Sequence, residues 1–139
     1  MKTITSYLLG FAITATILAI VFRFLLSYGI DNKMTWVIIA AAILYCVGMF
    51  VNGWYFGKKD NNYLPINDVG FRFHLTTYLI HNLVSELWFI LGFNSPYEKI
   101  GVIHKTAIIW GVFLLLHLIL YIYFRKKSID GLDKNRLFE

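Results

Sequence analysis

The chain has 139 residues, of which 58% are hydrophobic and 15% are charged. A soluble domain carries about 25% charged residues. Here the apolar residues also fall in long blocks, so the composition excludes an ordinary soluble domain and predicts one membrane domain. The net charge of +5 comes from basic residues at the ends of those blocks. This distribution is typical of membrane topology and lipid headgroup contact, and it argues against a nucleic-acid partner.

The first two apolar blocks predict membrane-spanning helices over residues 4–28 and 34–56. The first block is longer than the apolar part of a signal peptide, which has about 7–15 residues, so we expect a retained helix. A short polar turn at 29–33 makes the two helices antiparallel neighbours. Cys46, the single cysteine, lies in the second block, which excludes an internal disulfide. We interpret it as a small buried hydrophobic residue.

A polar segment at 57–70 separates these helices from a second pair. Lys58 and Lys59 end the second apolar block, and Asp60 and Pro65, with the neighbouring asparagines, predict a break in the helix. Two further spans are expected over 71–93 and 102–124. The predicted fold is therefore all-α, a polytopic membrane protein with four transmembrane helices in an antiparallel bundle over 1–127. A polar cytoplasmic tail is expected at 128–139.

The third span is distinct because one of its sides is polar. Residues 71–93 read FRFHLTTYLIHNLVSELWFILGF, which is long enough to cross a hydrocarbon core of about 30 Å. On a helix with about 100° per residue, the polar residues gather on one stripe and its flank. Lipid cannot satisfy polar groups, so this side should face protein or water. Its members are His74, Thr77, His81, Asn82, Ser85 and Glu86.

The basic residues predict how the spans are oriented. The second connection and the C-terminal region are rich in lysine and arginine, whereas the first and third connections hold only Lys33 and Lys99. Cytoplasmic segments carry the excess of basic residues, so both termini are expected in the cytoplasm. The lysine, asparagine and isoleucine content favours a bacterial inner membrane. Arg125, Lys126 and Lys127 end the fourth span, and we expect them to contact anionic lipid or a cytoplasmic partner.

Arg23 and Glu86 are charged residues within predicted spans. Both helices run outward, and the standard rise places the two residues about 8 and 10 Å from their outer helix ends. An unpaired charge inside the membrane is costly. We therefore predict an Arg23–Glu86 ion pair between the first and third spans. The alternative is that Arg23 extends to the outer surface while Glu86 is protonated or hydrated.

Three histidines lie within predicted spans. His74 and His81 lie seven residues apart on one face of the third span, and His117 lies on the fourth, at a depth between them and on a stripe with Trp110 and Tyr121. They leave three interpretations open. One is a haem b site with two histidine ligands from facing helices, and another is a metal or proton site. The third is hydrogen bonding between helices by neutral imidazoles. No other cofactor is expected.

The motifs of soluble enzymes are missing from the sequence. There is no glycine-rich phosphate loop, no nucleophile elbow and no H-E-x-x-H motif, so we do not expect an enzyme. Asp60, Asp68 and Glu98 fall in predicted connections, where short charged loops are usually just solvated.

The polar side of the third span carries the functional expectation. We expect a small oligomeric membrane protein that moves or senses an ion, a proton or a small polar solute through that side. Four spans enclose little water alone, so a pore would require a homo-oligomer. The alternative is a non-catalytic accessory subunit whose polar side packs within the bundle or against another membrane protein. A haem or metal protein is a further alternative.

Overall fold

The computed structural model describes residues 4–63 and 70–130, and the side chains of these residues except 63 and 124–130. Within those ranges the chain forms four helices and no strand: α1 (Ser6–Asp31), α2 (Thr35–Tyr63), α3 (Phe71–Ile90) and α4 (Ile100–Asp130). The prediction of an all-α chain with four helices is confirmed.

Three of these helices are long and apolar enough to cross a membrane. They are α1, α2 over Thr35–Asn62, and α4 over Ile100–Tyr123. Their outward surfaces carry large exposed apolar side chains, such as Ile17, Phe50 and Ile108. Such surfaces are unfavourable in water and suited to lipid. The three apolar helices thus indicate a membrane protein, in agreement with the composition.

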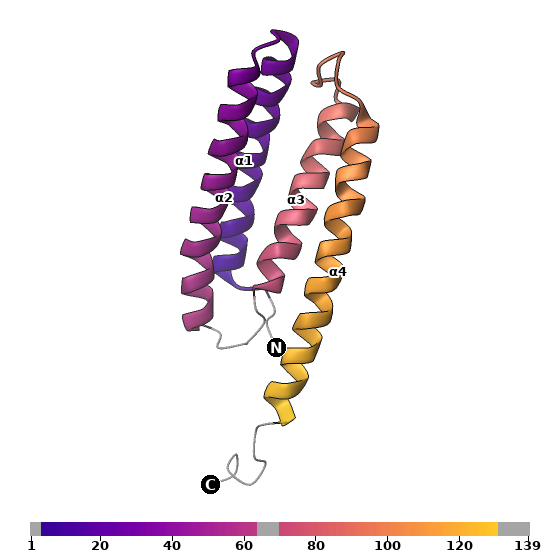
Figure 1. The fold of residues 1–139 in the computed structure, drawn as a ribbon. Helices are drawn as coiled ribbons and strands as arrows, with labels where there is room; N and C mark the ends of the chain where they lie inside the picture. Colours follow the sequence, from indigo (N-terminus) through magenta and orange to yellow (C-terminus); the bar gives the residue numbers. More distant parts are fainter. Residues whose placement is uncertain (1–3, 64–69, 131–139) are drawn as a thin grey trace.

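The helices lie side by side and alternate in direction (Figure 1). α1 packs against α2 on one side and against α3 on the other, and α4 packs against α3. The packing order is thus α2, α1, α3, α4, which makes α1 and α3 the two inner helices. Short connections at 32–34 and 91–99 join α1 to α2 and α3 to α4 at the same end of the molecule.

The inner position of α1 follows from a stripe of buried residues at intervals of four. Phe11, Ala15 and Ala19 are 1% exposed, and Arg23 and Ser27 continue the same stripe at 5%. Residues four apart lie on one face of a helix, and small residues there let neighbouring helices approach closely. The apolar half of the stripe packs the helices together, and its polar half holds a charged cluster.

Two helices continue past the spans predicted for them. α2 continues to Tyr63 through the segment expected to break it, and Asp60 is part of the helix. α4 continues to Asp130 and so includes the first residues of the predicted tail. Residues 64–69 and 131–139, which include Pro65 and Asp68, lie outside the described residues. The side chains of Arg125, Lys126 and Lys127 do so too, so their predicted lipid or partner contact remains a prediction.

Candidate functional site

Two of the predicted histidines meet between α3 and α4. The Nδ1 atoms of His74 and His117 are 2.8 Å apart. The indole Nε1–H of Trp110, also on α4, donates a hydrogen bond of 2.9 Å to Nε2 of His74. We call these three residues the His74–His117–Trp110 triad. Both ring nitrogens of His74 have a partner, His117 at Nδ1 and Trp110 at Nε2.

The partners of His74 fix which nitrogens carry protons. An indole nitrogen can only donate, so Nε2 of His74 accepts and has no hydrogen. A neutral His74 therefore carries its proton on Nδ1 and donates it to His117. Nδ1 of His117 must then accept, which leaves the His117 proton on Nε2. Both hydrogen bonds of the triad exist together only when both imidazoles are neutral.

Aromatic side chains from both helices surround the triad. Phe71 stacks on Tyr121 with ring centroids 5.2 Å apart and meets His117 edge-on at 5.7 Å. Tyr78 packs edge-on against Trp110 and donates a hydrogen bond of 3.2 Å to the carbonyl of Ala107. These contacts hold the rings of the triad in place. Beside the triad lies a hollow of about 530 Å³. It is lined by His74, Thr106, Ile109, Trp110 and Phe113.

His81 binds a residue of a different helix. Its Nδ1 atom is 3.0 Å from the hydroxyl of Tyr45 on α2, and Tyr45 stacks on Phe22 of α1. The His81 ring also lies 5.3 Å from that of Trp110. The polar side of α3 thus contacts α2 through His81 and α4 through His74, so it faces protein, as its sequence predicts.

The contact between His74 and His117 does not fit a metal ion or a haem iron held between these two residues. Two nitrogens that each lie about 2.0–2.1 Å from one tetrahedral ion are about 3.3 Å apart, and ligands on opposite sides of an iron are farther apart still. The 2.8 Å between His74 and His117 is a hydrogen-bond distance. Among the described residues, no group of three or more His, Cys, Asp or Glu side chains is placed to hold a metal ion.

The predicted Arg23–Glu86 ion pair is not formed. Arg23 instead binds Glu98, with 2.5 Å between Nη2 and Oε2, and both side chains are more than nine-tenths buried. Glu86 pairs with Nε2 of His104 on α4 at 2.9 Å, in a partly exposed position. The similar depth of Arg23 and Glu86 does not predict the partner of Arg23, because the connection between α3 and α4 places the carboxylate of Glu98 beside it.

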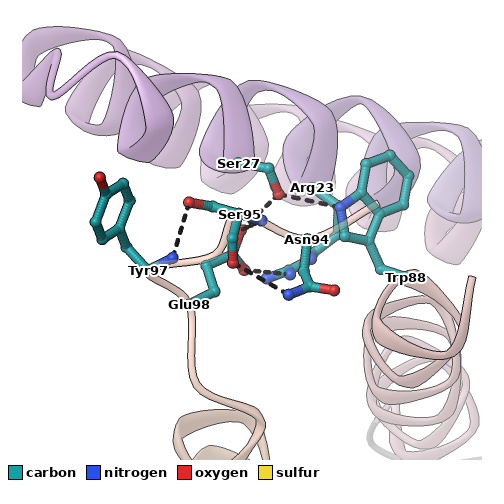
Figure 2. Close-up of polar contacts among 7 residues, drawn as sticks. All are labelled: Arg23, Ser27, Trp88, Asn94, Ser95, Tyr97 and Glu98. Carbon is teal, nitrogen blue, oxygen red and sulfur yellow. Dashed lines mark hydrogen bonds and ion pairs between the residues drawn. The ribbon is translucent and has the colours of Figure 1, made fainter. Parts of the chain in front are cut away.

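Glu98 is buried, although its place in a predicted connection indicated a solvated side chain. Its Oε1 accepts hydrogen bonds from Ser27 Oγ at 2.6 Å and from the backbone N–H of Ser95 at 3.1 Å. Trp88 Nε1 on α3 donates to Ser27 Oγ at 3.0 Å. Figure 2 shows this cluster between α1, the end of α3 and the connection that follows it. The signal was present in Ser95–Pro96–Tyr97–Glu98, which has the S-x-x-E spacing of a capping box.

The remaining predicted site residues make local contacts. Thr77 donates to the carbonyl of Phe73, and Asn82 to that of Tyr78, both within α3. Ser85 is 2% exposed, between helices. These residues satisfy polar groups inside the protein.

A second buried charge lies at the opposite end of the helices. The carboxylate of Asp60 accepts hydrogen bonds from the hydroxyl of Thr5 and from Arg72 Nη2, the latter at 2.6 Å. Thr5 also caps α1 by accepting from the N–H of Leu8. Asp60 therefore connects the end of α2 to the beginnings of α1 and α3, which explains why it is 2% exposed within a helix.

Comparison of the chain with protein-family models, with curated proteins and with solved structures found no match.

Proposed function

We propose that the protein is a four-span membrane protein that senses protons through the His74–His117–Trp110 triad. The observation that carries this proposal is the pair of hydrogen bonds from Trp110 to His74 and from His74 to His117. Both bonds require neutral imidazoles, and histidine is the side chain that ordinarily changes charge near neutral pH.

Protonation of either histidine removes one of these bonds. A second proton on His74 places an N–H on Nε2, opposite the N–H of Trp110. A second proton on His117 places an N–H on Nδ1, opposite the N–H of His74. Protonation of both adds repulsion between two cations whose nearest nitrogens are 2.8 Å apart. Acid therefore weakens the contact between α3 and α4. In this proposal, the two helices are closely packed when the histidines are neutral and loosened when they are protonated.

Other titratable groups of the described residues also face the contact between α3 and α4: Glu86 of α3 pairs with His104 of α4 at 2.9 Å. Tyr78 and His81 touch Trp110, and Tyr121 stacks on Phe71. On α1, Arg23 is within electrostatic reach of His81, but its guanidinium pairs with Glu98. Arg72, in the first turn of α3, pairs with Asp60. The buried charges of α1 and α3 are thus paired away from the triad.

The proposal includes the membrane placement of α3 and the orientation of the chain. α3 has 20 residues, about 30 Å at the helical rise, and lies between helices that are apolar enough to span. The basic residues around 58–72 and 125–136 favour cytoplasmic termini in a bacterial inner membrane. A reporter that is active only in the periplasm, fused after Glu139, should be inactive. Activity there would contradict this orientation.

Sensing is favoured over the other functions because the polar side of α3 is paired within the chain. A conducting path through a homo-oligomer would need that side to line water, and an accessory subunit would need it to bind another membrane protein. The described contacts of His74, His81 and Glu86 are instead to Trp110, Tyr45 and His104. The partners in this proposal are the lipid bilayer and protons.

The test is the distance between α3 and α4 as a function of pH. Spin labels would be attached to Leu83→Cys and Ile108→Cys, both exposed in the wild type, in a Cys46→Ser background in lipid nanodiscs. We expect a narrow distance distribution at about pH 8 and a longer or broader one at about pH 5. An unchanged distribution would contradict the proposal.

Matched variants assign the response to the triad. Replacing both His74 and His117 by Gln keeps hydrogen-bonding groups without a titratable ring, and should abolish the pH response. His104→Gln, which changes the partly exposed partner of Glu86, should keep it. A label pair on α1 and α2, at Ile17→Cys and Val47→Cys, should show no change. A response that survives the double Gln variant would assign it to other groups.

A further inference from the structure

An apolar groove runs between α1 and α2. It has a volume of about 590 Å³ and is lined mostly by hydrophobic side chains. Its two polar residues satisfy each other, since the hydroxyl of Thr14 donates to Asn52 Oδ1 at 2.6 Å. Gly48 lets Leu18 of α1 pack closely against α2, since an added methyl group would lie 3.1 Å from the Leu18 side chain. An occupant of the groove would therefore make mainly apolar contacts and would need few hydrogen-bonding groups.

One end of the groove is basic and aromatic. Trp54 and Tyr55 line that end. The Nζ atom of Lys58 lies 5.8 Å from the centre of the Trp54 ring, and that of Lys59 lies 4.2 Å from the Tyr55 ring. Both lysines are exposed. The neighbouring carboxylate, Asp60, is bound by Arg72 and Thr5, so it does not neutralise the lysines. Lys59 Nζ donates a hydrogen bond of 2.6 Å to the neutral hydroxyl of Tyr55, which leaves its charge for a ligand.

The position of this end along α2 matches a membrane surface. α2 begins at Thr35, and the helix from there to Trp54 is about 30 Å long, which is the thickness of the hydrocarbon core. Tryptophan and tyrosine favour the boundary between hydrocarbon and water. Lys58 and Lys59, one turn further, then lie at the level of lipid headgroups, where each lysine attracts anionic lipid.

We infer that this groove binds one anionic phospholipid. An acyl chain lies along Ile17, Leu18 and Val51, and the phosphate of the headgroup contacts Lys58 and Lys59. The two lysine charges complement the negative charge of the phosphate. The groove leads to these lysines, because Trp54 and Tyr55 line it and lie beside Lys58 and Lys59. This site lies between α1 and α2 and is separate from the triad between α3 and α4.

Native mass spectrometry of the detergent-purified protein tests this inference. The protein would be offered phosphatidylglycerol or phosphatidylcholine with identical acyl chains. We expect retained phosphatidylglycerol to exceed phosphatidylcholine by about fivefold for each lysine in contact. Equal retention of the two lipids would overturn the inference, as would full competition by inorganic phosphate alone, which has no acyl chain.

Two kinds of variant separate the headgroup from the acyl chain. Lys58→Gln with Lys59→Gln should remove the preference for phosphatidylglycerol, whereas Lys99→Gln with Lys105→Gln, an equal charge change at the other end of the helices, should keep it. Val51→Trp fills the groove from an exposed position and should reduce retention of both lipids. Preference that survives the Lys58 and Lys59 changes, or binding unaffected by Val51→Trp, would overturn the site.

Discussion

His74 and His117 face each other through their Nδ1 atoms at 2.8 Å, and only one of these atoms can carry the proton between them. Because Trp110 donates to the other nitrogen of His74, the proton belongs to His74. The contact between α3 and α4 thus depends on the protonation state of two imidazoles.

Replacing Trp110 by Phe tests the first bond of the triad. The change removes the donor to His74 Nε2, and a hydrogen bond between membrane helices is worth about 0.6–2 kcal/mol. Because phenyl is smaller than indole, packing is also lost at every pH. We therefore expect the loss in the free energy of unfolding to be larger at about pH 8 than at about pH 5 by the worth of the bond, since acid has already broken that bond. The stabilisation is present at high pH and lost as the pH falls. Trp88→Phe, which removes a donor to Ser27, should cost the same amount at both pH values.

Arg23 and Glu98 should behave as one unit. Breaking a buried ion pair by removing one partner costs about 3–5 kcal/mol, because the other charge stays buried and unpaired. We expect Arg23→Ala and Glu98→Ala each to cost about that much, and the double variant to cost far less than their sum. Unfolding in denaturing detergent measures these losses. In the same cycle with Arg23→Ala and Glu86→Ala, the losses of stability should be additive. Coupling between these two changes would instead support an Arg23–Glu86 ion pair.

Asp60 should be needed for the end of the molecule where α1 begins. Asp60→Ala leaves Arg72 and the cap of α1 without their acceptor, and losing a buried hydrogen-bonding partner costs about 1–3 kcal/mol. We expect that loss of stability, together with faster hydrogen exchange in the first turn of α1. Asp31→Ala, at the exposed end of the same helix, should change stability by less than about 0.5 kcal/mol. Equal effects of the two changes would count against this role.

Proton flux separates sensing from conduction. Glu86 pairs with His104 in a partly exposed position, so its carboxylate is not expected to lie on a proton path. Liposomes that contain the wild type and liposomes that contain Glu86→Gln should therefore have the same proton permeability, measured with an enclosed pH dye. Flux that depends on Glu86 would mean that copies of the chain assemble around a conducting path.

Much of the fold could be predicted from the sequence, because a helix that spans a membrane requires a long local run of apolar residues. The four helices follow from the length of the apolar blocks. Three of them are apolar enough to span a membrane, and the membrane crossing of α3 remains a prediction. The end of α2 could not be predicted in this way. Asp60 disfavours a helix locally, but bonds to Thr5 and Arg72, far away in the sequence, stabilise it there.

The candidate site could be predicted in part. Helical spacing places His74 on the polar stripe of the third span and His117 with Trp110 on one stripe of the fourth, and the antiparallel arrangement puts His117 at a depth between His74 and His81. That the two stripes face each other is seen only in the structure. Helical spacing could not predict which charges form ion pairs, because those pairs depend on the conformation of the connection between α3 and α4. Glu98 reaches Arg23 through the capping-box turn at Ser95, whereas depth along straight helices indicated Glu86.

The most direct test of the triad is the position of its protons. Nitrogen-15 NMR of histidine-labelled protein in nanodiscs distinguishes the two neutral ring forms from the cation. The His74 and His117 signals would be assigned with single Gln variants. At about pH 8, the account predicts a neutral His74 with its proton on Nδ1 and a neutral His117 with its proton on Nε2. A proton on Nε2 of His74 at that pH, in either its neutral or its cationic form, would contradict it.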